Sequence, residues 1–124
     1  MVRGRAPALL LVLLWPAGAA AQPATDAEQR ASELAREGNQ LAEQQRFGEA
    51  IDRWKRAEAL SSRLLHPCNI GLAYARWQRP AQAHLFLRLC RERALRDAVS
   101  VPDWVDARLA AVEAALRGGG FGQV

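Results

Sequence analysis

The side chains best suited to chemistry in this sequence are two histidines and two cysteines. His66 and Cys68 stand two positions apart, and His84 and Cys90 stand six positions apart. Side chains share one face of a helix when they are three or four positions apart, so neither pair presents two metal ligands together. Neither cysteine lies in a local signature of a nucleophilic enzyme. The pattern therefore predicts no metal site, no catalytic residue and no cofactor.

The first 21 residues have the composition of a signal peptide. Two early arginines give a positive start, residues 8–15 are apolar, and three alanines end at Ala21 in a small-residue cleavage site. The apolar stretch is well short of the roughly 18–20 residues that span a bilayer. We expect cleavage after Ala21 and an exported mature chain, either periplasmic or secreted. The alternative is an uncleaved membrane anchor, which Pro16 and Gly18 oppose because they break a helix early.

An exported chain with two cysteines favours a disulfide between Cys68 and Cys90. We expect Cys68 near the start of one helix and Cys90 toward the end of the next. Those two ends meet if the helices form an antiparallel pair. The alternative is that both thiols are buried as small apolar side chains.

Net charge argues against a nucleic-acid partner. The whole sequence carries a formal charge of +4, and the two arginines of the leader contribute half of it. Opposite charges alternate in Arg91-Glu92-Arg93, which describes a solvated helix surface rather than a phosphate-binding stripe. The glycines at 118–120 follow a helix instead of opening one, so they are no phosphate loop. We infer neither a small-molecule substrate nor an enzymatic activity.

Apolar spacing and capping signals predict five helices and no strand. Thr25 and Glu28 form a capping box before the first helix, which should end near Gln45. The expected later helices cover about 47–61, the stretch up to 78, about 80–98, and 101–117. Ser100 and Asp103 form a second capping box before the last helix.

Two apolar features predict how the third and fourth helices pack. In the third helix we expect Trp77 to continue the inner stripe of Ile70, Gly71 and Tyr74. In the fourth, Leu85 and Leu89 add a second stripe beside the main one, which comprises residues 83, 86, 87, 90 and 94. A helix that packs against both its partner and a following helix needs such a wide apolar face.

One supersecondary unit occurs twice in the chain. Gln45-Arg46 returns as Gln78-Arg79, a separation of 33 residues. Four further positions return at the same separation: Gly38 as Gly71, Ala50 as Ala83, Trp54 as Leu87, and Ala57 as Cys90. A period between about 20 and 50 residues marks stacked repeats, in which one unit cannot bury its own apolar face.

These two units resemble the tetratricopeptide repeat (TPR), whose pattern is W-x2-L-G-x2-Y, then A-x3-F, then P. The matches are Leu34, Gly38, Leu41, Ala50 and Trp54 in the first unit, and Ile70, Gly71, Tyr74, Ala83 and Leu87 in the second. The sequence departs from the pattern at Gln45 and Gln78, where the turn often has glycine. The alternative is an unrelated helical bundle.

The resemblance implies an all-α fold of two TPR-like antiparallel helix pairs plus a C-terminal capping helix. The repeats would cover about 31–63 and 64–97 and the cap helix 101–117, within a domain at 22–117. A flexible tail is expected at 118–124. We expect close approach of two helix backbones where Gly38 faces Ala50 and where Gly71 faces Ala83.

TPR arrays generally act as protein-binding scaffolds whose first helices line a groove. By that resemblance the groove candidates are Asn39, Glu43, Leu72 and Arg76. Leu72 is turned about 100° from Gly71 along its helix. It either offers an apolar contact to a partner or packs under the first repeat.

The resemblance also gives Asn39 and Asn69 a possible role. Some family members grip a C-terminal carboxylate with asparagines at these places, but Ala35 stands where a lysine is required. Simple capping or solvation is the favoured interpretation. We therefore expect an exported adaptor that binds a protein partner in the groove. The alternative is a self-associating structural subunit of a larger envelope complex, because repeat arrays usually need about three units for stability.

Overall fold

The computed structural model describes residues 3–4 and 22–119, and within them the chain is all-helical. The helices are α1 (Asp26–Glu43), α2 (Phe47–Leu60), α3 (Leu65–Arg76), α4 (Pro80–Arg96) and α5 (Trp104–Gly118). No strand occurs in these residues. The all-α prediction is confirmed. The predicted cleavage site and most of the predicted signal peptide and tail lie outside the described residues.

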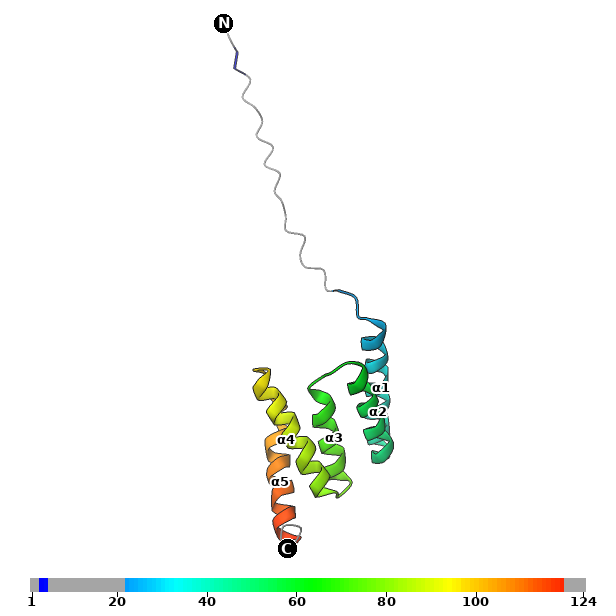
Figure 1. The fold of residues 1–124 in the computed structure, drawn as a ribbon, viewed down its shortest axis with the longest axis vertical. Helices are drawn as coiled ribbons and strands as arrows, with labels where there is room; N and C mark the ends of the chain where they lie inside the picture. Colours follow the sequence, from blue (N-terminus) through cyan, green and yellow to red (C-terminus); the bar gives the residue numbers. More distant parts are fainter. Residues whose placement is uncertain (1–2, 5–21, 120–124) are drawn as a thin grey trace.

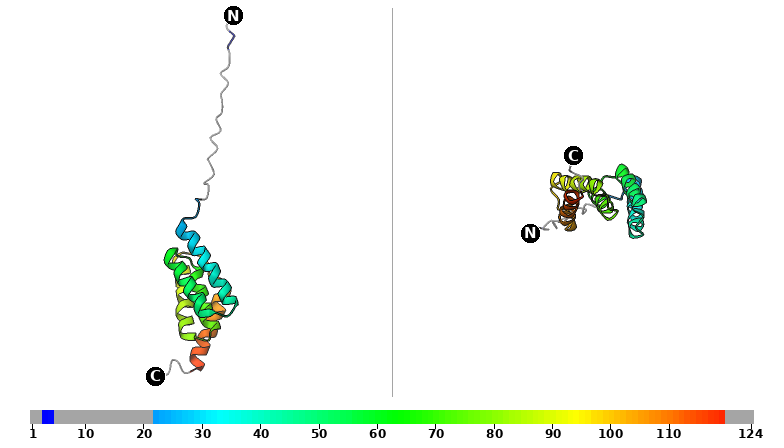
Figure 2. Two further views of the ribbon diagram at one scale, coloured as in Figure 1. Left: turned by 90° about the vertical axis from the view of Figure 1, so that its right-hand side faces the viewer. Right: turned by 90° about the horizontal axis from the view of Figure 1, so that it is seen from below.

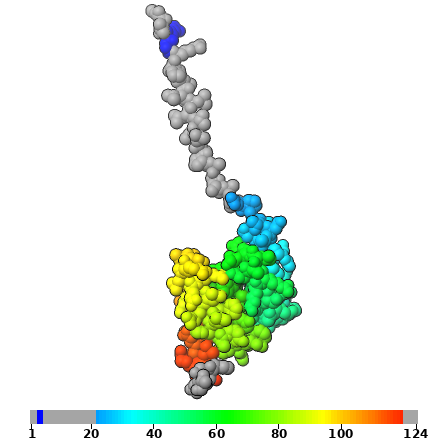
Figure 3. All heavy atoms as spheres, viewed as in Figure 1, coloured from blue at the N-terminus to red at the C-terminus, as the bar shows by residue number. Residues whose placement is uncertain are grey.

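The helices form a row of stacked antiparallel pairs. α1 packs along α2 and α3 packs along α4, while α2 also packs against α3 and α4 against α5. Figure 1 shows the α1–α2 pair at one side, α3 in the middle, and α4 with α5 at the other side. The view from below, at the right of Figure 2, shows the same order. In the space-filling view of Figure 3, α2, α3 and α4 form one continuous body. The arrangement is that of an α-solenoid-like fragment.

Helix starts follow the local sequence at two of the predicted places. The Glu28 amide donates a hydrogen bond to Thr25 Oγ1 (3.1 Å), which caps α1. Pro80 occupies the first turn of α4, where its missing N–H leaves no hydrogen bond unmade. The predicted Ser100–Asp103 capping box is wrong. α5 begins at Trp104 without a side-chain cap, and the Pro102 carbonyl accepts from the Val105 amide (3.0 Å) in the turn before it.

Three helices end in the same left-handed turn. Gln45 after α1, Gln78 after α3 and Ala98 after α4 have φ values of 60°, 59° and 54°. After each, the next amide donates back into the helix at 2.9 Å, from Arg46 to Leu41, from Arg79 to Tyr74, and from Val99 to Ala94. This hydrogen bond, joined by a second one from the left-handed residue itself, makes a Schellman motif that satisfies the last carbonyls of the helix. The turn geometry therefore repeats even where glycine is absent.

The close helix contacts also repeat with the 33-residue period. A methyl group on Gly38 would lie 2.7 Å from Trp54 Nε1, and one on Gly71 would lie 2.8 Å from Leu87 Cγ. Trp54 and Leu87 are equivalent positions of the two units. The nearest neighbours of the glycines are therefore Trp54 and Leu87, whereas the sequence had pointed to Ala50 and Ala83. Glycine is needed because these larger side chains lie directly on the helix backbone.

The core runs through the whole row of helices. One cluster joins α1, α2 and α3 around Trp54, Ile51 and Ile70, and another joins α4 to α5 around Leu87 and Leu109. Both are built from the apolar stripes that the sequence predicts. These clusters hold α3 between its neighbours at the middle of the row.

Three residues that were predicted to face inward are exposed instead. Leu85 and Leu89 are 63% and 38% exposed, because α5 packs on the Ala83–Leu87 stripe of α4 and not on the second stripe. Trp77 is 38% exposed, since it caps the end of α3 and its ring lies over Gly48 at the start of α2. The wide apolar face predicted for α4 is therefore wrong.

Candidate functional site

The four predicted groove residues line one cleft between α1 and α3. Asn39 and Glu43 come from α1, and Leu72 and Arg76 come from α3. The cleft has a volume of about 140 Å³, and Ala42, Trp54 and Ala73 also line it. In the sequence, Leu72 follows Asn39 by 33 positions and Arg76 follows Glu43 by 33 positions. The structure brings all four residues together.

Trp54 of α2 contributes to the floor of this cleft. α1 and α3 each pack on α2 and touch one another little, so a hollow remains between them. The Trp54 ring is fixed against α1, because it lies on Gly38 and its Nε1–H donates to the Ala35 carbonyl (3.2 Å). Leu72 is half-buried beside it. Leu72 thus belongs partly to the packing and partly to an accessible surface.

A second and larger cleft continues the first toward the start of α3. It has a volume of about 450 Å³ and shares Asn39 and Asn69 with the first cleft. Its other lining residues are Ala31, Ser32 and Ala35 of α1, and Arg63, Leu64, Leu65 and His66 around the start of α3. We call the two clefts together the α1–α3 groove.

Asn69, Leu65 and His66 were not among the predicted groove residues. Leu65 is 54% exposed and lines the second cleft, whereas Leu72 lines the first. Leu65 therefore offers a second apolar contact, toward the other end of the groove. Asn39 is exposed and Asn69 is half-buried, so both carboxamides are accessible from the groove. A useful signal was present in the sequence, since residues 65, 69, 72 and 76 follow one face of α3 at helical spacing.

The first cleft of the groove holds two charged residues that take part in no ion pair of the described chain. Within the described residues, Glu43 and Arg76 take part in no ion pair, and the Arg76 guanidinium lies 5.0 Å from the centre of the Phe47 ring. The cleft on the other side of α1 holds Arg46 and Arg53, which pair with Glu49 and Glu37. Its charges are balanced internally, while the charges of Glu43 and Arg76 remain available to a ligand. At the other end of the groove, Arg63 lies 3.8 Å from Glu28.

The partly buried carboxylate of Glu58 holds together the end of the groove that lies next to the start of α3. Glu58 of α2 accepts hydrogen bonds from Arg93 of α4 (2.6 Å), from the Arg63 amide (3.0 Å) and from His66 (2.7 Å). Ser62 donates to it as well (2.8 Å). Burial alone would raise the pKa of Glu58, but these donors outweigh burial and hold its pKa below the usual value. The cluster joins three helices and orients the buried His66 at the groove wall.

A disulfide fixes the opposite side of α3. Cys68 and Cys90 are bonded, with Cα atoms 4.9 Å apart, and both are fully buried against Val105 of α5. The pairing predicted from the sequence is present. Disulfides persist in oxidising compartments, so this bond indicates an oxidising, exported environment.

No further chemical site is found in the part of the chain that the structure describes. Residues 3–4 and 22–119 contain no group of three or more His, Cys, Asp or Glu side chains that could hold a metal. None of the described helices combines the length and apolar character that a membrane crossing needs. The surface that stands out is the α1–α3 groove.

Comparison with known proteins gave no match. No family model, curated protein or solved structure matches this sequence significantly.

Proposed function

We propose that this chain is an exported, TPR-like adaptor that holds a segment of a protein partner in the α1–α3 groove. The observation that carries the proposal is the meeting of Asn39, Glu43, Leu72 and Arg76 in one cleft, with both charges unpaired in the described residues. An apolar contact beside unpaired charges is the usual composition of a peptide-binding surface. The oxidising environment indicated by the disulfide supports a periplasmic or secreted location.

The groove suits an extended segment better than a helix. An asparagine side chain both donates and accepts, so Asn39 and Asn69 can bond to peptide N–H and C=O groups. A helix satisfies those groups internally, whereas an extended chain leaves them open. Along α3, from Leu65 to Arg76, the groove is about 16 Å long, because each helical residue rises about 1.5 Å. That length holds about five extended residues at roughly 3.3 Å each.

Photo-crosslinking in the native cell tests the proposal. A photoreactive amino acid at Asn39 should give a crosslink to one protein, and the same group at Gln82, on the exposed surface of α4, should not. Leu72→Asp together with Arg76→Glu should abolish the Asn39 crosslink. Leu60→Asp is a matched control, because Leu60 is an exposed leucine that does not line the groove.

The outcome depends on which variants lose the crosslink. Equal loss with Leu60→Asp would mean that any added charge disturbs binding, and the groove assignment would fall. Persistence of the crosslink in the Leu72 and Arg76 variant would also contradict the proposal. Thermal unfolding of each variant shows whether the change acts through the fold, because unfolding of the double variant would place Leu72 in the core.

A second function, self-association as a structural subunit, is favoured by the exposed face of α4. Leu85 and Leu89 lie one helical turn apart on that face and are 63% and 38% exposed. Neighbouring exposed leucines mark protein-binding surfaces. Light scattering of the purified chain distinguishes the two functions, since a monomer at micromolar concentration would exclude self-association through this face.

A further inference from the structure

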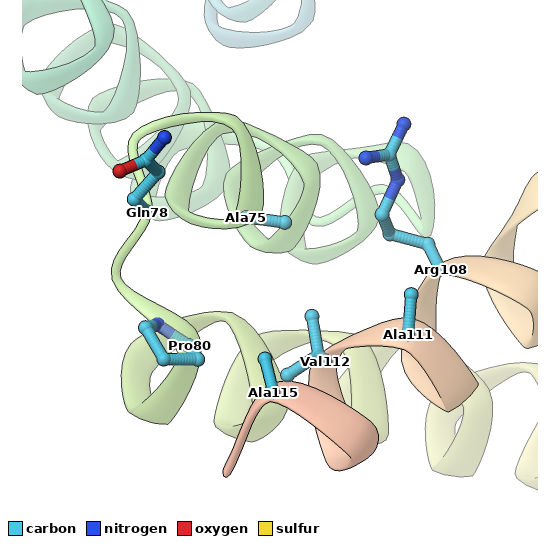
Figure 4. A pocket seen from close by; sticks show the side chains of 7 residues that line it. All are labelled: Ala75, Gln78, Pro80, Arg108, Ala111, Val112 and Ala115. Carbon is cyan, nitrogen blue, oxygen red and sulfur yellow. The ribbon is translucent and has the colours of Figure 1, made fainter. Parts of the chain in front are cut away.

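Another hollow lies on the side of α3 away from α1, between α3 and α5. Its volume is about 320 Å³. Figure 4 shows its walls, formed by Ala75, Pro80, Ala111, Val112 and Ala115, with Gln78 and Arg108 at opposite edges. We call it the α3–α5 pocket. No residue of this pocket was predicted as a site from the sequence.

The pocket exists because α5 presents alanines beside a firmly packed stripe. Val105, Leu109 and Val112 are buried and hold α5 against the core. Ala111 and Ala115 lie next to that stripe and are too small to fill the space before α3. An apolar cavity of about 150 Å³ already accepts benzene, so this pocket can take a leucine, methionine or phenylalanine side chain.

The charges of α5 are divided between its two sides. Asp106 lies 3.7 Å from Arg91, and Glu113 lies 3.5 Å from His84, so both carboxylates face partners on α4. Arg108 stands at the pocket and has no ion pair within the described residues. Arginine forms its strongest hydrogen bonds with carboxylates. An unpaired guanidinium at the edge of an apolar hollow therefore matches a ligand that is apolar and anionic at adjacent points.

The pocket and the α1–α3 groove meet across a single helix. Ala75 lines the pocket and the next residue, Arg76, lines the groove. A segment that leaves the groove near Arg76 therefore needs only to cross α3 to reach the pocket. Arg76, also unpaired in the described chain, stands at that crossing and adds to the positive charge there.

We propose that the α3–α5 pocket takes one large apolar side chain of the partner segment, while an acidic residue next to it binds Arg108. This inference rests on the proposed function, and it adds which residues the partner segment should contain: a large apolar residue next to an acidic one. Buried apolar anchors carry most of the binding energy in protein interfaces. The pocket thus sets specificity, and the groove holds the backbone.

Selection from a displayed library of random linear peptides tests the inference. The probe is the selected peptide, synthesised and titrated against the disulfide-bonded chain. We expect the selected sequences to share a large apolar residue adjacent to Asp or Glu. Ala111→Leu fills the pocket and should weaken binding about ten- to a hundredfold. Ala107→Leu, at an exposed alanine of α5 outside the pocket, should change binding by less than about twofold.

A charge reversal gives an independent readout that does not depend on packing. Arg108→Glu should weaken binding about tenfold or more. A peptide in which the Asp or Glu is replaced by lysine should bind this variant again, which would confirm the contact between Arg108 and the acidic residue. Arg117→Glu is the matched control, because Arg117 is exposed on the same helix away from the pocket. Both substitutions lie on the surface, and circular dichroism shows whether the helices remain.

Each result separates the pocket from the groove. If peptides respond to Leu72→Asp but not to Ala111→Leu or Arg108→Glu, the proposed function stands and this inference is overturned. If no peptide is selected, or none responds to any of these variants, both are overturned. If Ala111→Leu instead changes the oligomeric state, the occupant is a second copy of the chain, which also contradicts the inference.

Discussion

Replacing Gly71 by alanine tests the closest helix contact in the fold. In the structure a Cβ at position 71 would lie 2.8 Å from Leu87 Cγ, and 2.9 Å from both Leu87 Cδ2 and the Leu87 backbone nitrogen. The backbone nitrogen cannot rotate away as a side chain can. α4 would therefore have to shift relative to α3, although Cys68 and Cys90 tie these two helices together.

The expected cost follows from two opposing effects. Alanine in place of glycine within a helix gains about 1 kcal/mol in propensity. Inserting a methyl group into a well-packed contact costs about 1–3 kcal/mol, and the high end applies where backbone atoms are hit. We expect Gly71→Ala to lower the free energy of unfolding by about 1–2 kcal/mol. That corresponds to a fall in Tm of about 4–16 °C for a domain of this size.

Urea unfolding followed by circular dichroism gives the free energy of unfolding. Gly118→Ala is the control, because a Cβ at position 118 would meet no atom within 4 Å. The control should be as stable as the parent or slightly more stable. If Gly71→Ala also matched or exceeded the parent, helix propensity would dominate at both glycines, and the close approach of α3 and α4 would be refuted.

Three other predictions concern the turns, the disulfide and the Glu58 cluster. Gln45→Gly and Gln78→Gly should each raise the free energy of unfolding by about 0.5–1 kcal/mol, because glycine adopts the left-handed conformation without steric cost; a loss of stability in urea unfolding would contradict this. Replacing Cys68 and Cys90 by alanine should lower it by about 3 kcal/mol in the chain-entropy model, measured against the oxidised parent; no difference would mean that the bond is absent. Glu58→Gln should destabilise the chain at neutral pH. Because the folded pKa of Glu58 is depressed, its contribution is complete above the unfolded value of about 4.3 and is lost as pH falls through the folded pKa. A stability difference from the parent that did not shrink in acid would refute that assignment.

Most of the fold could be predicted because the information is local. The capping threonine of α1 and the proline that starts α4 each act within one turn of helix. The 33-residue period is visible directly in the sequence, because equivalent positions carry equivalent residues. Predictions failed where the outcome depends on a neighbouring element. Leu85 and Leu89 were expected to be covered, but the position of α5 decides which stripe of α4 is buried. Trp77 was expected to face inward, yet α3 ends before it.

The candidate site could be predicted only in part, and for a similar reason. Asn39, Glu43, Leu72 and Arg76 follow from the repeat, since equivalent residues occupy equivalent faces. The Glu58 cluster could not be found, because Arg93 stands 35 positions from Glu58 and no period relates them. The α3–α5 pocket also gave no signal, because three of its lining residues are alanines whose spacing is that of any exposed helix face. Absence of a large side chain becomes informative only when the facing helix is known.

The disulfide and the α1–α3 groove lie on different sides of α3. Cys68 faces α4, where it bonds to Cys90 beside Val105, whereas Asn69, Leu72 and Arg76 face the groove. Trp54 of α2, with no contribution from the disulfide, forms part of the groove floor. Removing the disulfide should therefore lower the unfolding free energy without closing the groove. In the cysteine-free chain, a peptide should still bind the groove under conditions in which the chain is folded. The α3–α5 pocket depends on how α5 packs, so binding there should weaken before binding in the groove.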